Sequence, residues 1–372
     1  LNKFTITVNR KYPSGEYEFV LSDTQITDWK EDINTNEGEA RQYYCVNVTE
    51  PGTLGRLIKA DKKNPDKIRN LKVSGKIWKS DMDFMRDSMS NLQSINLREV
   101  RICASYTYSV NEDNGRNDYT FNEPKSEDEL KELIPRMENI ASYWESPADQ
   151  LGVFGSKQLI NFVFPEILTS IPDNAFSNSS LLAGALIIPD GVKTIGENAF
   201  SECSSISSLD LPEGLETIEY GAFYRCHGLS GTLHLPESLN SIGDLAFSLC
   251  SGLGGNLVLP HDLIYLGTEA FANTGFSGDL TIPESLTELQ EGVFRDCSGL
   301  NGQLYLHDNV KFTSVNNAWG TFQNCSFTGE LIIPENSIEI PDKCFSNQMS
   351  SMFASLFSNE YAVVRWKRIC RR

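Results

Sequence analysis

Residues 231–250 read GTLHLPESLNSIGDLAFSLC, and similar stretches recur throughout the second half of the chain. Each copy carries Leu-x-Leu-Pro, then Leu-x-x-Ile or a relative of it, then Ala-Phe, and most copies continue to Cys and Gly. From Phe176 to Phe345 the phenylalanines recur every 23 or 24 residues, apart from a step of 28 between Phe294 and Phe322. Self-similarity at a fixed period of this length predicts a solenoid of stacked repeats.

One copy is too small to bury its own apolar face, so neighbouring copies must stack to share a core. The Leu-x-Leu step predicts a strand with both leucines inward, and the proline after it ends the strand because it has no N–H to donate. The phenylalanines are expected to stack on the far wall of the coil. The longer copies carry a glycine in their extra space, which suits a bulge or a positive-φ turn; these glycines are Gly184, Gly231, Gly255, Gly278, Gly302 and Gly329.

The pattern Leu-x-x-Leu-x-Leu-Pro…Ile…Ala-Phe-x-x-Cys resembles the BspA-like (Treponema pallidum-type) leucine-rich repeats of bacterial surface proteins. Residues 232–250 and 279–297 carry it best, and a weaker echo in residues 71–75 and 92–97 resembles the degenerate repeats that precede the regular array in gut Bacteroidetes members. The resemblance implies a leucine-rich-repeat solenoid, right-handed and curved, in a mostly β (α+β) fold class. It also implies a protein displayed on, or secreted from, a bacterial cell.

Four segments are expected along the chain. Residues 1–50 alternate like strands and predict an antiparallel β cap. Residues 51–158 combine degenerate repeats with a helical insertion: a short helix from Ser80 to Met89, a hairpin tip or solvated turn at 111–118, and an amphipathic helix that opens at the capping box of Ser126 and Glu129. Residues 159–347 form the regular repeats, and residues 348–372 a C-terminal helical cap with a basic tail.

Net charge and hydropathy limit the classes of partner that the chain can bind. The net charge of −18 argues against nucleic acid, whose phosphates require a basic surface. No apolar run reaches the ~20 residues needed to span a membrane. The chain begins at Leu1 without a signal-like segment, which we interpret as a mature or trimmed chain. We expect a monomer.

The cysteines and histidines are predicted to have structural roles rather than catalytic or metal-binding ones. Nine cysteines cannot all pair within the chain, and the pairing of Cys45, Cys103 and Cys370 stays open. Five others each follow a phenylalanine by three residues and form a ladder of small, buried side chains: Cys203, Cys226, Cys250, Cys297 and Cys325. The four histidines occupy different slots of their repeats, so no metal site or cofactor is expected. Because familiar catalytic motifs are missing from the sequence, we predict a non-enzymatic protein.

The exposed strand residues therefore carry the functional hypothesis. Stacked repeats turn the outward positions of the Leu-x-Leu step into one long face, which solenoids commonly use for binding. The candidate partner-binding residues are Asp210, His234, Val258, Asp279, Thr281, Tyr305, Glu330 and Ile332. The insertion near residues 309–320 adds a second candidate, Trp319, for which packing is the alternative role.

Three functions are considered. The first is an adhesin-like binding protein that recognises a protein or glycan on host or neighbouring cells. The second is a scaffolding part of an envelope assembly, with the N-terminal β unit as the contact. The third, a remote alternative, is a hydrolase that uses carboxylates of the N-terminal insertion.

Overall fold

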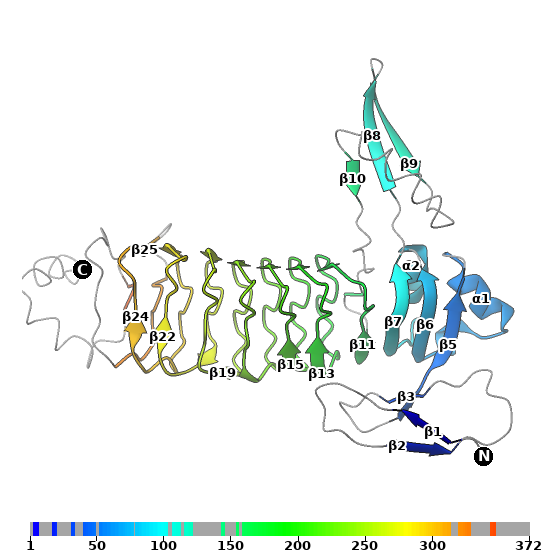
Figure 1. The fold of residues 1–372 in the computed structure, drawn as a ribbon, viewed down its shortest axis with the longest axis horizontal. Helices are drawn as coiled ribbons and strands as arrows, with labels where there is room; N and C mark the ends of the chain where they lie inside the picture. Colours follow the sequence, from blue (N-terminus) through cyan, green and yellow to red (C-terminus); the bar gives the residue numbers. More distant parts are fainter. Residues whose placement is uncertain are drawn as a thin grey trace, which may run out of the picture.

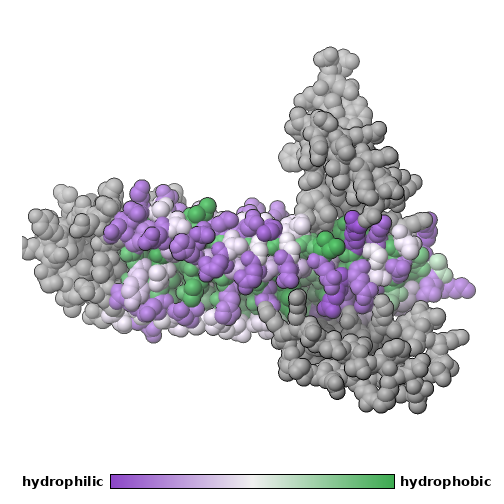
Figure 2. Space-filling model, viewed as in Figure 1, coloured by the Kyte–Doolittle hydropathy of each residue, from purple (hydrophilic) through white to green (hydrophobic). Residues whose placement is uncertain are grey.

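The computed structural model describes residues 3–6, 17–20, 31–33, 40–49, 52–77, 79–102, 106–112, 115–121, 143–145, 154–155, 158–313, 319–328 and 343–346. Most of these residues form an elongated solenoid whose strands pair in parallel from one turn to the next (Figure 1). Seen from the same side, its surface mixes hydrophilic residues with smaller hydrophobic patches (Figure 2). The predicted repeat solenoid is therefore confirmed. Its handedness and curvature stay predictions, and the predicted C-terminal helical cap lies outside the described residues.

The solenoid begins with a four-stranded parallel sheet in the order β11-β7-β6-β5. Helices connect β5 to β6 and β6 to β7. The second of these helices, α2, lies within one residue of the helix predicted at residues 80–89. The elements are β5 (Tyr44–Val48), α1 (Leu54–Ala60), η1 (Pro65–Lys67), β6 (Asn70–Ile77), α2 (Lys79–Ser88), β7 (Ser94–Ile102) and β11 (Asn161–Val163). Leu71 pairs with Ile95, so the two weak sequence echoes are adjacent turns of the solenoid.

The strands described within residues 1–50 are not all antiparallel. Two antiparallel pairs are present, β1 (Lys3–Ile6) with β2 (Tyr17–Val20) and β3 (Glu31–Ile33) with β4 (Ala40–Gln42). The next strand, β5, instead pairs in parallel with β6, because its buried Val46 and Val48 join the solenoid core. The parallel sheet therefore already includes Tyr44, and the expected boundary at residue 50 falls after its first strand.

A buried carboxylate joins the two helices of this first part. Asp81, in the first turn of α2, is 1% exposed and accepts hydrogen bonds from the backbone N–H groups of Gly52 (2.6 Å) and Leu54 (2.9 Å). Thr53, at the N-cap of α1, makes no side-chain capping bond. Asp81 therefore caps α1 from the neighbouring helix, satisfying N–H groups that a helix start leaves unpaired.

A three-stranded antiparallel sheet is inserted between β7 and β11. It contains β8 (Tyr106–Glu112), β9 (Gly115–Phe121) and β10 (Tyr143–Glu145) in the order β10-β8-β9, and it projects away from the solenoid axis (Figure 1). Glu112 pairs with Gly115, so the predicted hairpin tip at 111–118 is confirmed. The helix predicted to start at the Ser126 capping box lies outside the described residues.

In the regular array, one side of each turn carries short strands at the predicted Leu-x-Leu step or just before it, and we call these strands together sheet A. The strands are β13 (Gly184–Ile187), β15 (Ile206–Asp210), β17 (Gly231–Thr232), β19 (Leu253–Gly255), β21 (Gly275–Phe276), β22 (Leu280–Thr281) and β24 (Leu304–Tyr305). Inward leucines such as Leu186 and Leu304 are buried, as expected.

Sheet A is interrupted where the prediction made it continuous. Residues 233–235 and 257–259 are not strands, because pairing shifts to the preceding segment, with Gly231 opposite Leu253. The cause is the extra residue of the longer turns, where Gly231 and Gly255 have φ values of 82° and 72° and redirect the chain. Gly184 and Gly278 are left-handed too, and Gly184 marks a register shift.

A second sheet on the opposite side is more continuous, and we call it sheet B. Its strands are only two residues long, and they align turn after turn in the order β12-β14-β16-β18-β20. They are β12 (Ser170–Ile171), β14 (Thr194–Ile195), β16 (Thr217–Ile218), β18 (Ser241–Ile242) and β20 (Tyr265–Leu266), followed by the pair β23 (Glu288–Leu289) and β25 (Lys311–Phe312). Each strand places one residue in the core and one on the surface.

The third wall of the solenoid is the predicted phenylalanine ladder. Successive rings stack 5.1–6.1 Å apart with interplanar angles of 2–17°, from Phe154 at the start to Phe345 at the end. Phe154 extends the ladder one turn earlier than the sequence period shows. Along the same wall the backbone N–H of each phenylalanine donates to the next turn, as Phe223 does to Ala246 (2.8 Å).

The cysteine ladder has a defined structural role. Each ladder thiol donates to the carbonyl oxygen of the phenylalanine in the preceding turn, as Cys226 does to Phe200 (3.0 Å) and Cys250 to Phe223 (3.0 Å). The same contact recurs at 3.1 Å for Cys203, Cys297 and Cys325. The prediction of small buried residues with a weak donor is therefore confirmed.

Candidate functional site

The predicted face of sheet A is exposed where the structure describes it. Ile187, Val258 and Tyr305 have exposed fractions of 46%, 62% and 51%, which is high for large apolar side chains. Asp210, His234, Asp279 and Thr281 are exposed as well. Glu330 and Ile332, the last two predicted residues, lie outside the described residues.

Strand pairing brings some of these residues together at the two ends of the face. Ile187 lies opposite Asp210, and Thr281 lies opposite Tyr305. His234 and Val258 lie between these pairs, on the two turns where sheet A is interrupted. The face therefore consists of two ordered strand pairs separated by a less regular central part.

Asp279 also has a structural role. Its carboxylate accepts a hydrogen bond from the backbone N–H of Gln303 (2.7 Å), and it lies where a side chain on Gly302 would have to be. A substitution of Asp279 would therefore disturb the turn as well as the surface, which makes Tyr305 and His234 the cleaner probes. Within residues 185–305, the outward rows of sheet A contain no lysine or arginine.

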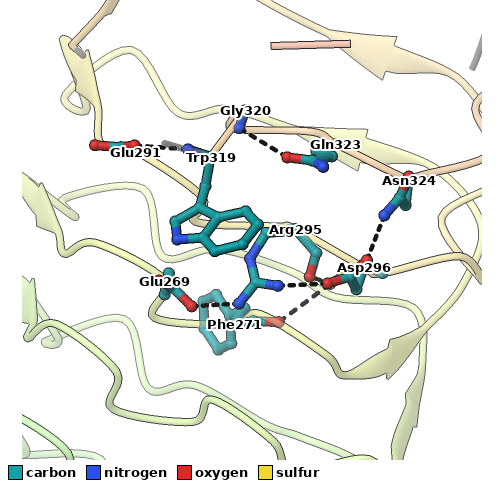
Figure 3. Close-up of polar contacts among 10 residues, drawn as sticks. Glu269, Phe271, Glu291, Arg295, Asp296, Trp319, Gly320, Gln323 and Asn324 are labelled. Atoms are coloured by element: carbon teal, nitrogen blue, oxygen red, sulfur yellow. Dashed lines mark hydrogen bonds and ion pairs between the residues drawn. The ribbon is translucent and has the colours of Figure 1, made fainter. Parts of the chain in front are cut away.

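Trp319, the other predicted candidate, lies on the phenylalanine wall and is partly engaged (Figure 3). The Arg295 guanidinium stacks 4.4 Å from the centroid of its ring. Arg295 is held in turn by Glu269 (2.5 Å) and Asp296 (2.7 Å), and the Trp319 backbone N–H donates to Glu291 (2.7 Å). The packing role is therefore present, while 44% of the Trp319 side chain stays exposed.

An exposed aromatic cluster that the sequence analysis did not single out lies along the edge of sheet B. Tyr220 is 43% exposed, Tyr265 is 41% exposed and Ile264 is 65% exposed. The Tyr265 hydroxyl donates to Asp244 (2.9 Å), and the N–H of Gly221 donates to the Asp244 carbonyl (2.9 Å). These residues come from three successive turns and from different slots of the repeat, so their proximity is invisible in a single copy. One sequence feature could have indicated this cluster. Tyr220 lies three residues before Phe223, in the same slot of the repeat as Trp319, which lies three residues before Phe322.

Buried thiols and possible metal ligands are the titratable groups that bear on reactivity. Burial raises the pKa of the Cys297 thiol to about 11 and that of Cys344 to about 12. Such thiols are neutral and poor nucleophiles at physiological pH. Within the described residues no group of three or more His, Cys, Asp or Glu side chains is arranged to hold a metal ion.

One histidine is set among acidic groups. A hydrogen bond to Asp262 (2.9 Å) raises the pKa of His261, and the charges of Asp262, Glu237 and Glu284 raise it further. Its ring is fully on the surface, so this pairing contributes little to stability. None of the helices in the described segments has the length and apolarity that a membrane crossing needs.

Comparisons with known proteins agree with this architecture. The family model of the BspA type leucine rich repeat region, in six copies, matches residues 169–301 and 254–359. Together these matches span residues 169–359, just over half of the 372 residues. Among curated proteins, none matches the chain.

Several solved structures are similar in part. The leucine-rich repeat protein of Treponema pallidum is 31% identical over 39% of this chain and 66% of its own, just under two thirds of its length, with a TM-score of 0.35. A leucine-rich repeat protein from Bacteroides ovatus is 20% identical over 89% of this chain and 87% of its own (TM-score 0.43). A leucine rich cell surface protein from Faecalibacterium prausnitzii is 17% identical over 57% and 77% (TM-score 0.30).

Proposed function

Because the chain belongs to the family of BspA-type leucine-rich-repeat proteins, we propose that it is a non-enzymatic binding protein at the surface of a bacterial cell or secreted from it. The exposed face of sheet A would engage a protein or glycan ligand. The observation that carries this proposal is the row of exposed apolar and aromatic side chains, Ile187, Val258 and Tyr305, on a rigid stack of turns. Large apolar side chains exposed among polar ones on one face of a solenoid are typical of interaction surfaces.

The face suits contact rather than catalysis. Its side chains project from consecutive turns, which presents a long strip of exposed residues to a ligand. The strip is long enough to contact an extended ligand at several points. An aromatic side chain such as Tyr305 is the type most often found at the energetic centre of an interface.

A binding screen with two double variants tests this proposal. The purified chain is applied to host matrix proteins and to a glycan array, beside Tyr305→Ala/His234→Ala. The matched control is Thr194→Ala/Thr217→Ala, which alters the same number of side chains on sheet B. We expect a ligand whose affinity falls about tenfold or more in the sheet A variant and less than twofold in the control. Equal binding by all three proteins would contradict a sheet A site.

The scaffolding alternative is separated by a truncation. Since β5 belongs to the parallel sheet, the deletion should remove residues 1–42 and leave Tyr44–Val48 in place. A scaffold that uses the N-terminal strands would lose its envelope partners in a pull-down, whereas a sheet A binding protein would keep its ligand. Protease accessibility on intact cells measures the proposed surface location, and sedimentation measures the proposed monomeric state.

A further inference from the structure

We propose a second docking surface, distinct from sheet A, on the edge between sheet B and the phenylalanine wall, whose partner is a protein segment rich in arginine. The surface comprises the exposed aromatic cluster together with the carboxylates beside it. We call it the Tyr220 surface, and its residues are Asp173, Glu197, Glu219, Tyr220, Asp244, Ile264 and Tyr265.

The exposed side chains of this surface come from three successive turns, with a carboxylate on the turn between the two tyrosines. Tyr220 and Asp244 occupy the same slot of adjacent turns, and Tyr265 reaches Asp244 from the turn after that. Ile264 precedes Tyr265 and is 65% exposed. Gly243 lies against the Tyr220 backbone, where an added side-chain carbon would come 2.6 Å from the Tyr220 nitrogen. Because Gly243 has no side chain, nothing from that position stands between the two tyrosines.

The charge of this surface is entirely negative. Asp173 and Glu197 occupy the Tyr220 slot in the two preceding turns, and Glu219 is the residue before Tyr220. Burial raises the pKa of Glu219, and the charges of Glu197 and Asp173 raise it further. In the described part of the chain no ion pair engages any of the three, although Asp173 accepts the N–H of Glu197 (2.8 Å). A positive charge from a partner would relieve this repulsion.

The chain itself shows which cation fits such a slot. Four turns further along the wall, Trp319 occupies the slot of Tyr220. There the preceding turn supplies Arg295 against the ring, held by Glu269 and Asp296. At Tyr220 the corresponding residue of the preceding turn, one after Phe200, is Ser201. The carboxylates at Tyr220 come from other slots than those at Trp319. The positions that match Glu269 and Asp296 are Asn174 and Glu202, and Glu202 already pairs with Arg225 (3.2 Å). An aromatic ring and the carboxylates of the Tyr220 surface are thus present, but the slot that supplies Arg295 at Trp319 supplies no guanidinium at Tyr220.

Arginine is favoured over lysine for a physical reason. A guanidinium can lie flat on an aromatic ring and still donate to carboxylates at its edge, as Arg295 does, whereas an ammonium is a compact and strongly hydrated charge. Two exposed tyrosines spaced along the solenoid offer more than one such position. The partner is therefore a chain that presents several arginines rather than a single cation.

The test uses the full chain and fluorescein-labelled octa-arginine and octa-lysine peptides as probes, with dissociation constants measured by fluorescence anisotropy at 0.15 M salt. We expect tighter binding of octa-arginine than of octa-lysine. Glu197→Gln/Glu219→Gln should weaken octa-arginine binding about tenfold. Tyr220→Leu, which keeps an apolar side chain and all charges, should weaken it roughly threefold and reduce the preference for arginine.

A matched variant separates a site from net charge. Glu213→Gln/Glu284→Gln removes the same two charges from exposed positions away from the tyrosines, and we expect a change below twofold. Equal weakening by both double variants would overturn the proposal, because long-range attraction by the acidic chain would then explain binding. An unchanged affinity of Tyr220→Leu would overturn it as well. So would a neutral oligosaccharide such as cellohexaose that displaces the peptide from the wild type but not from Tyr220→Leu, since the surface would then be a glycan site.

Discussion

Replacing one phenylalanine of the ladder should reveal how much the stacking of turns contributes to stability. Phe247 is fully buried and stacks on Phe223 at 5.1 Å and on Phe271 at 5.5 Å. Phe247→Leu keeps an apolar side chain but removes both stacks, each worth about 0.5–1.5 kcal/mol, and leaves unfilled volume worth about 1 kcal/mol. We therefore expect the free energy of unfolding to fall by about 2–4 kcal/mol.

A second buried phenylalanine provides the control. Phe276 is equally buried but has one ring contact, an edge contact with Phe271 at 5.6 Å. Phe276→Leu should therefore cost about 1 kcal/mol less than Phe247→Leu. Urea unfolding of the full chain, followed by circular dichroism and tryptophan fluorescence, measures both values.

A double-mutant cycle isolates the stack itself. Phe223 and Phe247 share the 5.1 Å contact, so the cycle built on their leucine variants should give a coupling energy of about 0.5–1.5 kcal/mol. Phe176 and Phe247 are three turns apart and do not touch, so their cycle should give a coupling near zero. Equal coupling energies for the two pairs, or none for either, would refute the view that ring stacking joins adjacent turns.

Other parts of the chain give further predictions. Asp81→Ala should destabilise the protein by about 2–4 kcal/mol in the same urea assay, because the N–H of Leu54 would lose its buried acceptor. Leu245→Asn should raise the melting temperature slightly in calorimetry, because Leu245 has φ of 58° and asparagine tolerates this conformation better. In native protein at pH 8, iodoacetamide should alkylate half-buried Cys45 well before Cys297, as mass spectrometry would show. Since the pKa of Cys297 is raised from 9.0 to about 11 by burial, stability should fall as pH rises across this interval.

The period of the sequence was sufficient to predict the core. Phe200, Phe223 and Phe247 recur in the same slot, and a residue type that repeats at a fixed step must occupy the same place in each turn. The burial of Cys226 and its role as a weak donor followed from the same logic. A repeated pattern thus predicts contacts between turns well, because every turn has the same local geometry and stacks on its neighbour in the same way.

The secondary structure between these positions was harder to predict. Sheet B is built from strands such as Thr194–Ile195, which are too short for alternation to be visible in one copy. The loss of strand at residues 233–235 depended on how Gly231 redirects the chain, which a glycine permits but does not dictate. Phe154 escaped detection because the turn it belongs to has lost the rest of the pattern.

The surface was least predictable. The exposure of Val258 and Tyr305 followed from their slot, since outward strand positions face solvent. The proximity of Tyr220 and Tyr265 did not, because they occupy different slots in turns separated by a third. Surface clusters in a solenoid form from residues that differ between copies, whereas a repeat pattern describes what the copies share.

The stacked ladder also determines how the molecule would respond to mechanical load. Each turn of the regular array is held by hydrogen bonds and ring contacts to its two neighbours, so force applied at the ends would detach turns one after another rather than all at once. A released turn of 23 or 24 residues frees roughly 80 Å of extended chain. Such a molecule would lengthen in steps under fluid shear, taking up the tension while the turns that remain stacked keep their exposed faces in order.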